Sequence, residues 1–295
     1  MSKLTKQLAE PGILIADGAT GTMLQRAGLP RGMAPERWNL ENPQAIRDLH
    51  KSYFGAGADV VLTNSFGGTR YRLERDGLSG QVHEVNRAAA QLAVETASEN
   101  GLVFGDIGPL GALLKPLGKV TFEEARDAFA EQAGGLAEGG VDAILIETMG
   151  DLNEAKAAIE GVRLETDLPI IVTMSFDTHG YTVMGVSPTQ AVTELWKLGL
   201  AAVGANCGRT LSETLKAIQE MRRAVPEAVL MAKPNAGLPQ IHTKEQQATQ
   251  LVYDVSPEVM SEYACQFAEL GVKIFGGCCG STPEHIRAIA RALRA

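Results

Sequence analysis

The sequence predicts an α/β fold, and more specifically a single (β/α)8 TIM barrel that extends over residues 1–295. Short runs rich in Val and Ile alternate with segments of helical periodicity, a pattern typical of repeated strand-helix units. Eight such runs can be counted, and no Pro- or Ser-rich linker or change of composition divides the chain. The length would allow two domains, but barrels of this kind often reach about 250 residues as one domain. We therefore expect one barrel domain.

The eight predicted strands are short and nearly continuous in apolar residues, as expected for parallel strands that are covered on both faces. They are Ile13–Asp17, Asp59–Asn64, Leu102–Ile107, Ala143–Glu147, Pro169–Phe176, Ala202–Asn206, Ala228–Pro234 and Lys273–Gly276. In a barrel of this kind, functional side chains lie at the carboxyl ends of the strands and in the loops that follow. The residues at these eight ends are therefore the first candidates for a site.

The segments between the strands are predicted helices. One apolar stripe at helical spacing consists of Met260, Tyr263, Ala264 and Phe267. Thr121 and Glu124 form a capping-box pattern, and a cap residue precedes a first-turn proline at Ser256-Pro257 and Thr282-Pro283. Glycines are expected to end one helix and lead into the next strand at Gly57, Gly140, Gly199 and Gly271.

The longest stretch without a predicted element is Asn235–Ser256. Connections of this length are usually functional or mobile. Because the stretch follows the seventh predicted strand, we expect it to lie over the catalytic face of the barrel.

Composition excludes several classes of protein. The 35 acidic residues exceed the 27 basic ones, which gives a net charge of -8 and argues against nucleic-acid binding. Hydrophobic residues at 45% and charged residues at 21% indicate a globular chain with a large core. Met1–Glu10 lacks the apolar stretch of a secretory signal, and no apolar run approaches the roughly 18 residues of a membrane span. We expect a cytoplasmic protein without a nucleic-acid or membrane partner.

Three of the four cysteines stand at predicted strand ends. Cys207 follows the sixth strand, and Cys278 and Cys279 follow the eighth. In a closed barrel one strand lies between the sixth and the eighth, so the three sulfurs could meet over the mouth of the barrel. Adjacent residues of an extended strand point to opposite faces, so both Cys278 and Cys279 can face one point only if the strand breaks there. The neighbouring glycines, Gly276, Gly277 and Gly280, permit that break.

Three cysteines arranged in this way would form a zinc site with one open position, which is typical of catalytic rather than structural zinc. The alternative is that a buried cysteine acts as a small hydrophobic residue. We adopt that alternative for Cys265, which lies within a predicted helix and has no Cys or His neighbour. A redox pair of Cys278 and Cys279 is disfavoured because a disulfide between adjacent residues is strained.

The charge of the predicted site indicates its chemistry. A zinc ion held by three thiolates carries a net charge of -1, which suits it poorly to polarising a carbonyl or acidifying water. A metal-bound thiol, however, loses its proton at neutral pH and remains nucleophilic. The site would therefore present a substrate thiolate to an electrophile, and methyl transfer is the simplest reaction of that type.

These residues resemble the zinc-dependent homocysteine S-methyltransferases. The resemblance extends over nearly the whole chain and rests on four motifs: Asp17-Gly18-Ala19-Thr20-Gly21-Thr22, Asn206-Cys207, Gly276-Gly277-Cys278-Cys279-Gly280 and Thr282-Pro283-Glu284-His285-Ile286. It implies an eightfold barrel, one Zn²⁺ held by Cys207, Cys278 and Cys279, and homocysteine as the thiol acceptor that is converted to methionine. No catalytic residue beyond the metal site is required, because transfer from an onium donor needs no general acid or base.

The resemblance also suggests how the amino-acid end of homocysteine is held. Glu147 and Asp17 would receive the ammonium group, although Asp17 could equally be a helix cap or turn residue. Backbone amides around Gly18 and Ala19 would receive the carboxylate, and Asn206 would bind substrate or only orient the metal loop. Three further residues are expected to line the donor side: Thr63, Asn64 and Asp106. His285 is expected to be exposed or to cap a helix.

The identity of the methyl donor stays open. Gly67 occupies a position where the betaine-dependent enzymes carry tyrosine, which argues against betaine, while Lys233–Gly237 resembles the cobalamin-linked branch. That branch normally adds folate and corrinoid domains, for which 295 residues leave no room. We therefore expect either a separate methyl-corrinoid protein or a free sulfonium such as S-methylmethionine. The alternatives are a zinc subunit that acts only with a corrinoid protein and a methyltransferase for another thiol. The oligomeric state is also left open, and a homo-oligomer is possible because the exposed faces of barrel helices often pair between copies of a protein.

Overall fold

The computed structural model describes residues 1–238, 240–242 and 250–294 and contains a (β/α)8 barrel, as the sequence predicts. Eight parallel strands form one sheet in the order β1-β10-β7-β6-β5-β4-β3-β2. An isolated bridge between Ala16 and Val60 joins its two edges and closes the barrel. The strands are β1 (Leu14–Ile15), β2 (Val60–Leu62), β3 (Leu102–Ile107), β4 (Ala143–Met149), β5 (Ile170–Met174), β6 (Ala202–Cys207), β7 (Leu230–Pro234) and β10 (Val272–Phe275).

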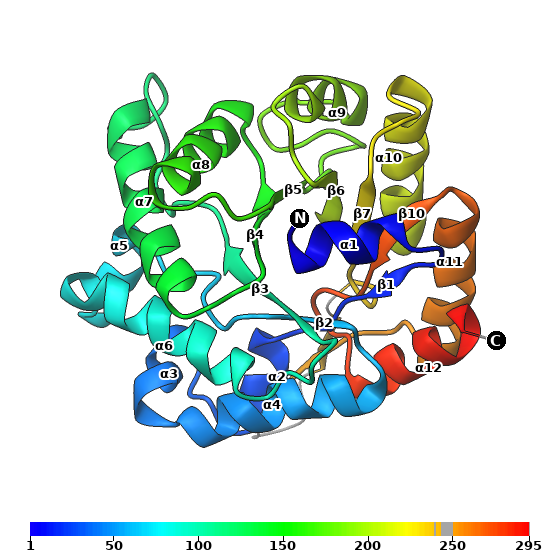
Figure 1. Ribbon diagram of the computed structural model, residues 1–295, viewed down its shortest axis with the longest axis horizontal. Coiled ribbons are helices and arrows are strands. Elements are labelled where there is room, and N and C mark those ends of the chain that lie inside the picture. Colours follow the sequence, from blue (N-terminus) through cyan, green and yellow to red (C-terminus); the bar gives the residue numbers. More distant parts are fainter. Residues whose placement is uncertain (239, 243–249, 295) are drawn as a thin grey trace.

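Helices form the outer layer around these strands (Figure 1). Those that follow the eight strands in turn are α4 (Pro43–Ala56), α6 (Val82–Val94), α7 (Phe122–Glu138), α8 (Leu152–Glu165), α9 (Pro188–Trp196), α10 (Leu211–Ala224), α11 (Pro257–Glu269) and α12 (Pro283–Leu293). Shorter helices are α1 (Lys3–Ala9), α2 (Gly21–Arg26), α3 (Trp38–Glu41) and α5 (Arg70–Leu73), with 3-10 turns at Pro35–Arg37, Glu74–Asp76 and Ser79–Gln81.

The predicted helix signals are confirmed. Thr121 and Glu124 form the capping box of α7, and Ser256 caps α11 through the amide of Val259. The four glycines at the helix ends all have positive φ, between 71° at Gly199 and 104° at Gly57. His285 is buried and caps α12, since its Nδ1 accepts the amide of Thr282 at 3.2 Å.

One prediction about the chain between β7 and α11 is wrong. Asn235–Ser256 is not a stretch without an element, because β8 (Gln240–His242) and β9 (Gln250–Val252) pair there as an antiparallel ribbon. Strands of three residues are too short to show a period of two in the sequence. Residues 243–249 lie outside the described part of the chain.

Besides a small cluster of Leu73, Leu78, Val82 and Val85, the apolar core has two layers. Side chains between the sheet and the surrounding helices form the larger one, and a smaller one fills the barrel itself. Leu4 of α1 belongs to the inner layer and is fully buried. Lys3 and Gln7 of the same helix donate to the carbonyls of Gly101 and Asn100, just before β3 begins. Helix α1 therefore closes the amino-terminal end of the barrel, where it lies across the strands in Figure 1.

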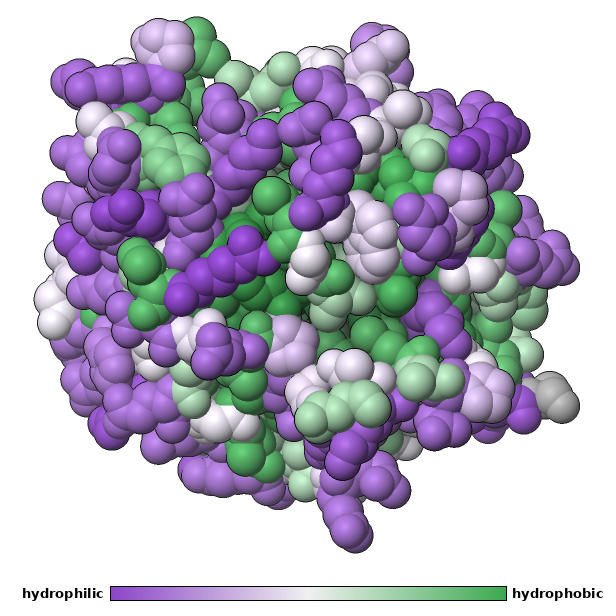
Figure 2. Space-filling model, turned by 45° about the horizontal axis from the view of Figure 1, so that its top comes forward, coloured by the Kyte–Doolittle hydropathy of each residue, from purple (hydrophilic) through white to green (hydrophobic). Residues whose placement is uncertain are grey.

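The outer surface on the side shown in Figure 2 is mostly hydrophilic, with smaller apolar areas between the polar side chains. Among the described residues, no helix combines the length and the hydropathy that crossing a membrane would require.

Replacing Leu4 with Ala tests the role of α1. We expect Leu4→Ala to lower the free energy of unfolding by about 2–5 kcal/mol, because it leaves a cavity in the inner core. Urea unfolding followed by circular dichroism measures the change. Leu164→Ala on α8 is the control, since this side chain is 61% exposed and should change stability by less than about 0.5 kcal/mol. Equal effects of the two substitutions would contradict the packing of α1 into the barrel.

Candidate metal centre and substrate cavity

The three strand-end cysteines meet at the carboxyl-terminal mouth of the barrel. Strand β7 lies between β6, which ends at Cys207, and β10, which precedes Cys278 and Cys279. The three Sγ atoms lie within 4.8 Å of one another. Thiolates bound to one tetrahedral zinc at about 2.3 Å would lie about 3.8 Å apart, so small side-chain adjustments would allow the three sulfurs to share one ion. Cys265 is half-buried on α11 and is not part of this group.

The chain leaves the strand direction after β10, as predicted, and its three glycines permit this in two different ways. A Cβ atom at Gly277 would lie 2.1 Å from Ser281 Oγ, and one at Gly276 would lie 2.7 Å from the carbonyl oxygen of Asp17. Gly280 has a φ of +81° and packs against the ring of Tyr253. The first two glycines thus permit close approach, and only the third is needed for its backbone angle.

Asn235 links the two cysteine segments. Its Nδ2 donates to the carbonyl of Gly208 at 2.7 Å and lies 3.5 Å from Cys207 Sγ. Its Oδ1 accepts the amide of Cys279 at 3.0 Å. Asn235 was part of a motif noted in the sequence, but the sequence does not indicate this bridging role.

The donor set fits a divalent metal ion. The hydrogen bond with Cys207 raises the pKa of Cys278 well above that of an ordinary thiol, and burial contributes in the same direction. Without a cation, thiols this close to one another resist ionisation because each thiolate repels the next. A bound divalent ion would reverse that balance, since it stabilises the thiolates. These groups are therefore better suited to holding a metal than to acting as free nucleophiles.

A cavity of about 540 Å³ opens beside the cysteines, and Glu147, Asp106 and Lys233 contribute to its wall. Glu147 Oε2 and Asp106 Oδ1 are buried without a hydrogen-bond partner among the described residues. Burial raises the pKa of both carboxyl groups. A buried polar atom without a partner is costly unless a ligand or water satisfies it. The two orphaned oxygens therefore indicate a site for a hydrogen-bond donor, preferably a cation.

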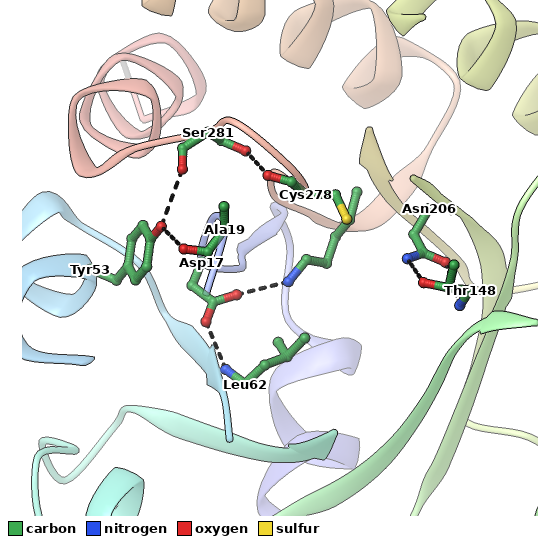
Figure 3. A network of polar contacts seen from close by, with 9 residues as sticks. Asp17, Ala19, Tyr53, Leu62, Thr148, Asn206, Cys278 and Ser281 are labelled. Atoms are coloured by element: carbon green, nitrogen blue, oxygen red, sulfur yellow. Dashed lines mark hydrogen bonds and ion pairs between the residues drawn. The ribbon is translucent and has the colours of Figure 1, made fainter. Parts of the chain in front are cut away.

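Asp17 has a partner within the protein. Its Oδ1 lies 2.8 Å from Lys233 Nζ and its Oδ2 accepts the amide of Leu62, also at 2.8 Å (Figure 3). Both charged side chains are at most 3% exposed. Asp17 does not line the cavity, whereas Lys233 does. The sequence did not indicate this ion pair, because Asp17 follows β1 whereas Lys233 lies on β7, 216 residues later.

Gly18 and Ala19 line the cavity as expected, but the backbone around them is partly engaged. The amide of Ala19 donates to the carbonyl of Ser281 at 3.2 Å. Tyr53 donates its hydroxyl to the carbonyl of Ala19 at 2.7 Å (Figure 3). The Ala19 amide is thus less available to a substrate carboxylate than the sequence suggested.

Three further predicted residues differ in their placement. Asn64 lines the cavity, whereas Thr63 lies behind it and hydrogen-bonds Ser65 and the amide of Asp106. Asn206 is buried and hydrogen-bonds Thr148, which itself lines the cavity.

The cavity has one aromatic side chain among its described lining residues, Phe66. The guanidinium carbon of Arg72 lies 5.4 Å from the centre of this ring, and Arg72 Nε donates to the carbonyl of Pro109. Glu36 is buried nearby and accepts the amide of Gly67 at 2.6 Å. One face of the Phe66 ring is therefore already engaged by a cation of the protein.

Comparison with known proteins agrees with this architecture. The chain is 34% identical over 301 aligned positions to methionine synthase of Mycobacterium tuberculosis and 33% identical over 302 to that of Mycobacterium leprae. Each alignment includes 95% of this chain but 24% of the relative, so the chain spans about a quarter of these proteins.

Solved structures share the fold. The metallated form of the homocysteine methyltransferase MmuM from Escherichia coli has a TM-score of 0.82 with 22% identity, over 99% of this chain and 100% of that one. A methyltransferase from Methanosarcina mazei has a TM-score of 0.63 with 11% identity, over 99% of this chain and 97% of that one.

The family comparison is the most specific. Residues 14–293 match the model of the homocysteine S-methyltransferase family, and this range includes all eight barrel strands and the three converging cysteines. The chain therefore belongs to the homocysteine S-methyltransferase family.

Proposed function

We propose that this protein transfers a methyl group to the thiol of homocysteine, giving methionine, at a zinc ion held by Cys207, Cys278 and Cys279. The convergence of these three sulfurs beside a cavity with unpaired carboxylate oxygens carries the proposal. Family membership supports the acceptor.

Three cysteine ligands leave one of the four usual positions of zinc for the thiol of the substrate. Zinc at this site would lower the pKa of that thiol, so that it is held as a nucleophilic thiolate. The protein's own contribution is to hold the sulfur and the methyl group in line. Asn235 supports this geometry because it connects the segments that carry Cys207 and Cys279.

The deep wall of the cavity suits the ammonium group of an amino acid. Asp106 and Glu147 of the wall both feel the charge of Lys233, but the Lys233 ammonium is paired with Asp17 behind the wall. A substrate ammonium would bring a second positive charge and satisfy Glu147 Oε2 and Asp106 Oδ1. In this proposal Asp17 acts through Lys233 rather than on the substrate, while Gly18 and Ala19 remain candidates for contacts with the substrate carboxylate.

The lining of the cavity favours a methyl-corrinoid over an onium donor. Onium groups are commonly recognised by several open aromatic faces, but Phe66 is the one aromatic residue of the described lining and Arg72 lies over one of its faces. A methyl-corrinoid would be presented at the barrel mouth by another module or protein, its cobalt would keep the electron pair of the broken Co–C bond, and it would need no cage for a free cation. We therefore propose that the donor is a methyl-corrinoid carried by another module or protein.

Substitution of single cysteines tests the metal site. We expect Cys207→Ser, Cys278→Ser and Cys279→Ser each to weaken zinc binding by more than about 100-fold, because even the loss of an outer-shell partner costs 10- to 100-fold. Zinc content after dialysis against a chelator gives the measurement. Cys265→Ser is the matched control and should retain zinc fully. A strand-end variant that keeps its zinc would remove that cysteine from the ligand set.

Neutralising Glu147 tests the amino-acid subsite. We expect Glu147→Gln to raise the KM for homocysteine about 10- to 100-fold, as a hydrogen bond to a charged group contributes about 1.5–3 kcal/mol, with zinc content unchanged. Steady-state kinetics and metal analysis together give the result. Glu160→Gln, on the exposed surface of α8, should match the wild type. An unchanged KM in the Glu147 variant would argue against ammonium binding at this carboxylate.

A panel of donors tests the methyl source. With zinc-loaded protein and homocysteine, we expect methionine to form with methylcobalamin or a methyl-corrinoid protein, and at least tenfold more slowly with S-methylmethionine or betaine. Quantifying methionine by mass spectrometry separates these cases. Faster turnover with S-methylmethionine would replace the corrinoid proposal by a sulfonium one and leave the acceptor unaffected. If homocysteine binds but no donor of the panel yields methionine, the result would instead favour a non-catalytic zinc subunit.

A further inference from the structure

Two strained residues border the cavity, one near the end of β4 and the other at the end of β6. Among the described residues other than glycine, positive φ occurs at Thr148 (61°), His179 (53°) and Cys207 (58°). Such angles are rare, especially for a β-branched residue such as threonine, and cost about 1–3 kcal/mol each. Thr148 and Cys207 both line the cavity. Strain of this kind persists only where surrounding contacts hold it in place.

The strain at Thr148 coincides with a bulge in β4. Ile146 pairs with Val172 of β5, but the next pair is Met149 with Met174. Three steps along β4 therefore match two along β5, so β4 contains one extra residue. A bulge redirects the side chains around it and is common beside active sites. Here it comprises Glu147 and Thr148, which both face the cavity.

The side chain of Asn206 holds this bulge. Its Oδ1 accepts the amide of Thr148 at 2.8 Å and the hydroxyl of Thr173 at 2.7 Å. Its Nδ2 donates to the hydroxyl of Thr148 at 2.7 Å (Figure 3). Asn206 is 1% exposed and is not among the residues that line the cavity. One amide side chain thus binds both the backbone and the side chain of the strained residue.

We propose that Asn206 is a positioning residue that couples the metal-binding end of β6 to the bulge of β4. Asn206 directly precedes Cys207, and Thr148 directly follows Glu147. The hydrogen bonds of Asn206 therefore help to set the separation between the Cys207 sulfur and the Glu147 carboxylate, since both residues line the cavity. This inference rests on the proposed function, since that separation must match the length of homocysteine, from its thiol to its ammonium.

The geometry favours this role over direct contact with the substrate. Both lone pairs of Oδ1 and one N–H of Asn206 are engaged within the protein. Thr173, the third partner, lies on β5 between the two strands, so the network extends across β4, β5 and β6. A change at Asn206 should therefore alter where Glu147 and Cys207 lie, rather than remove a substrate contact.

A double-mutant cycle of Asn206→Ala and Thr148→Gly tests the coupling. Glycine adopts a φ near 61° without strain, so it should reduce the need for Asn206. We expect Asn206→Ala to raise the KM for homocysteine about 10- to 100-fold with a smaller fall in kcat and with zinc retained. Adding Thr148→Gly to Asn206→Ala should lower the KM for homocysteine again by at least threefold. The same substitution should raise the melting temperature more in the Asn206→Ala background than in the wild type. Asn153→Ala, exposed on α8, is the control and should change neither quantity.

The outcomes separate the inference from the proposed function. An unchanged KM in Asn206→Ala, or no rescue of either KM or melting temperature by Thr148→Gly, would overturn the positioning role. A lowered melting temperature alone would indicate a purely structural residue and would overturn it as well. If the wild type neither binds nor methylates homocysteine, the proposed function itself fails. The melting temperatures of the cycle then still decide whether Asn206 holds the bulge.

Discussion

The order of strands β6, β7 and β10 around a closed barrel is the constraint on which the site depends. Closure through the Ala16–Val60 bridge gives every strand end a defined position at the mouth. Cys207 and Cys278 are distant in the sequence, but only β7 lies between the strands that precede them. Their Sγ atoms and that of Cys279 therefore lie within 4.8 Å of one another. The loops need only make fine adjustments, through close-approach glycines after β10 and through Asn235 after β7. The barrel thus brings the sulfurs together, and local chemistry aligns them.

The buried charges next to the sulfurs explain how an apolar barrel can carry a polar cavity. Lys233 and Asp17 neutralise each other in a place where either charge alone would be very costly. Glu147 and Asp106 are not fully compensated in this way, and burial raises the pKa of both. This local imbalance is tolerable in a stable fold if a positively charged substrate completes it. In the proposed function, the same imbalance would favour amino acids over simple thiols as substrates.

Much of the architecture can be predicted from the sequence because its signals are local. The eight strands, the capping box at Thr121 and the glycines that end the helices depend on residues close together in the chain. The strand-end cysteines could be recognised for the same reason, once a barrel was assumed. The short ribbon of β8 and β9 was missed, since three residues do not establish a periodicity.

The sequence by itself determined the fold class, the ends of the strands to within two residues and which cysteines could meet. Only the tertiary structure decided the partners of the buried polar groups. Lys233 of β7 pairs with Asp17, which follows β1 on the far side of β10, and Asn206 holds Thr148 in a bulge of β4. These pairings join strands that are distant in the chain, and they depend on register and side-chain direction. A pattern of residue types carries no information about either, because both arise only when the strands pack against one another.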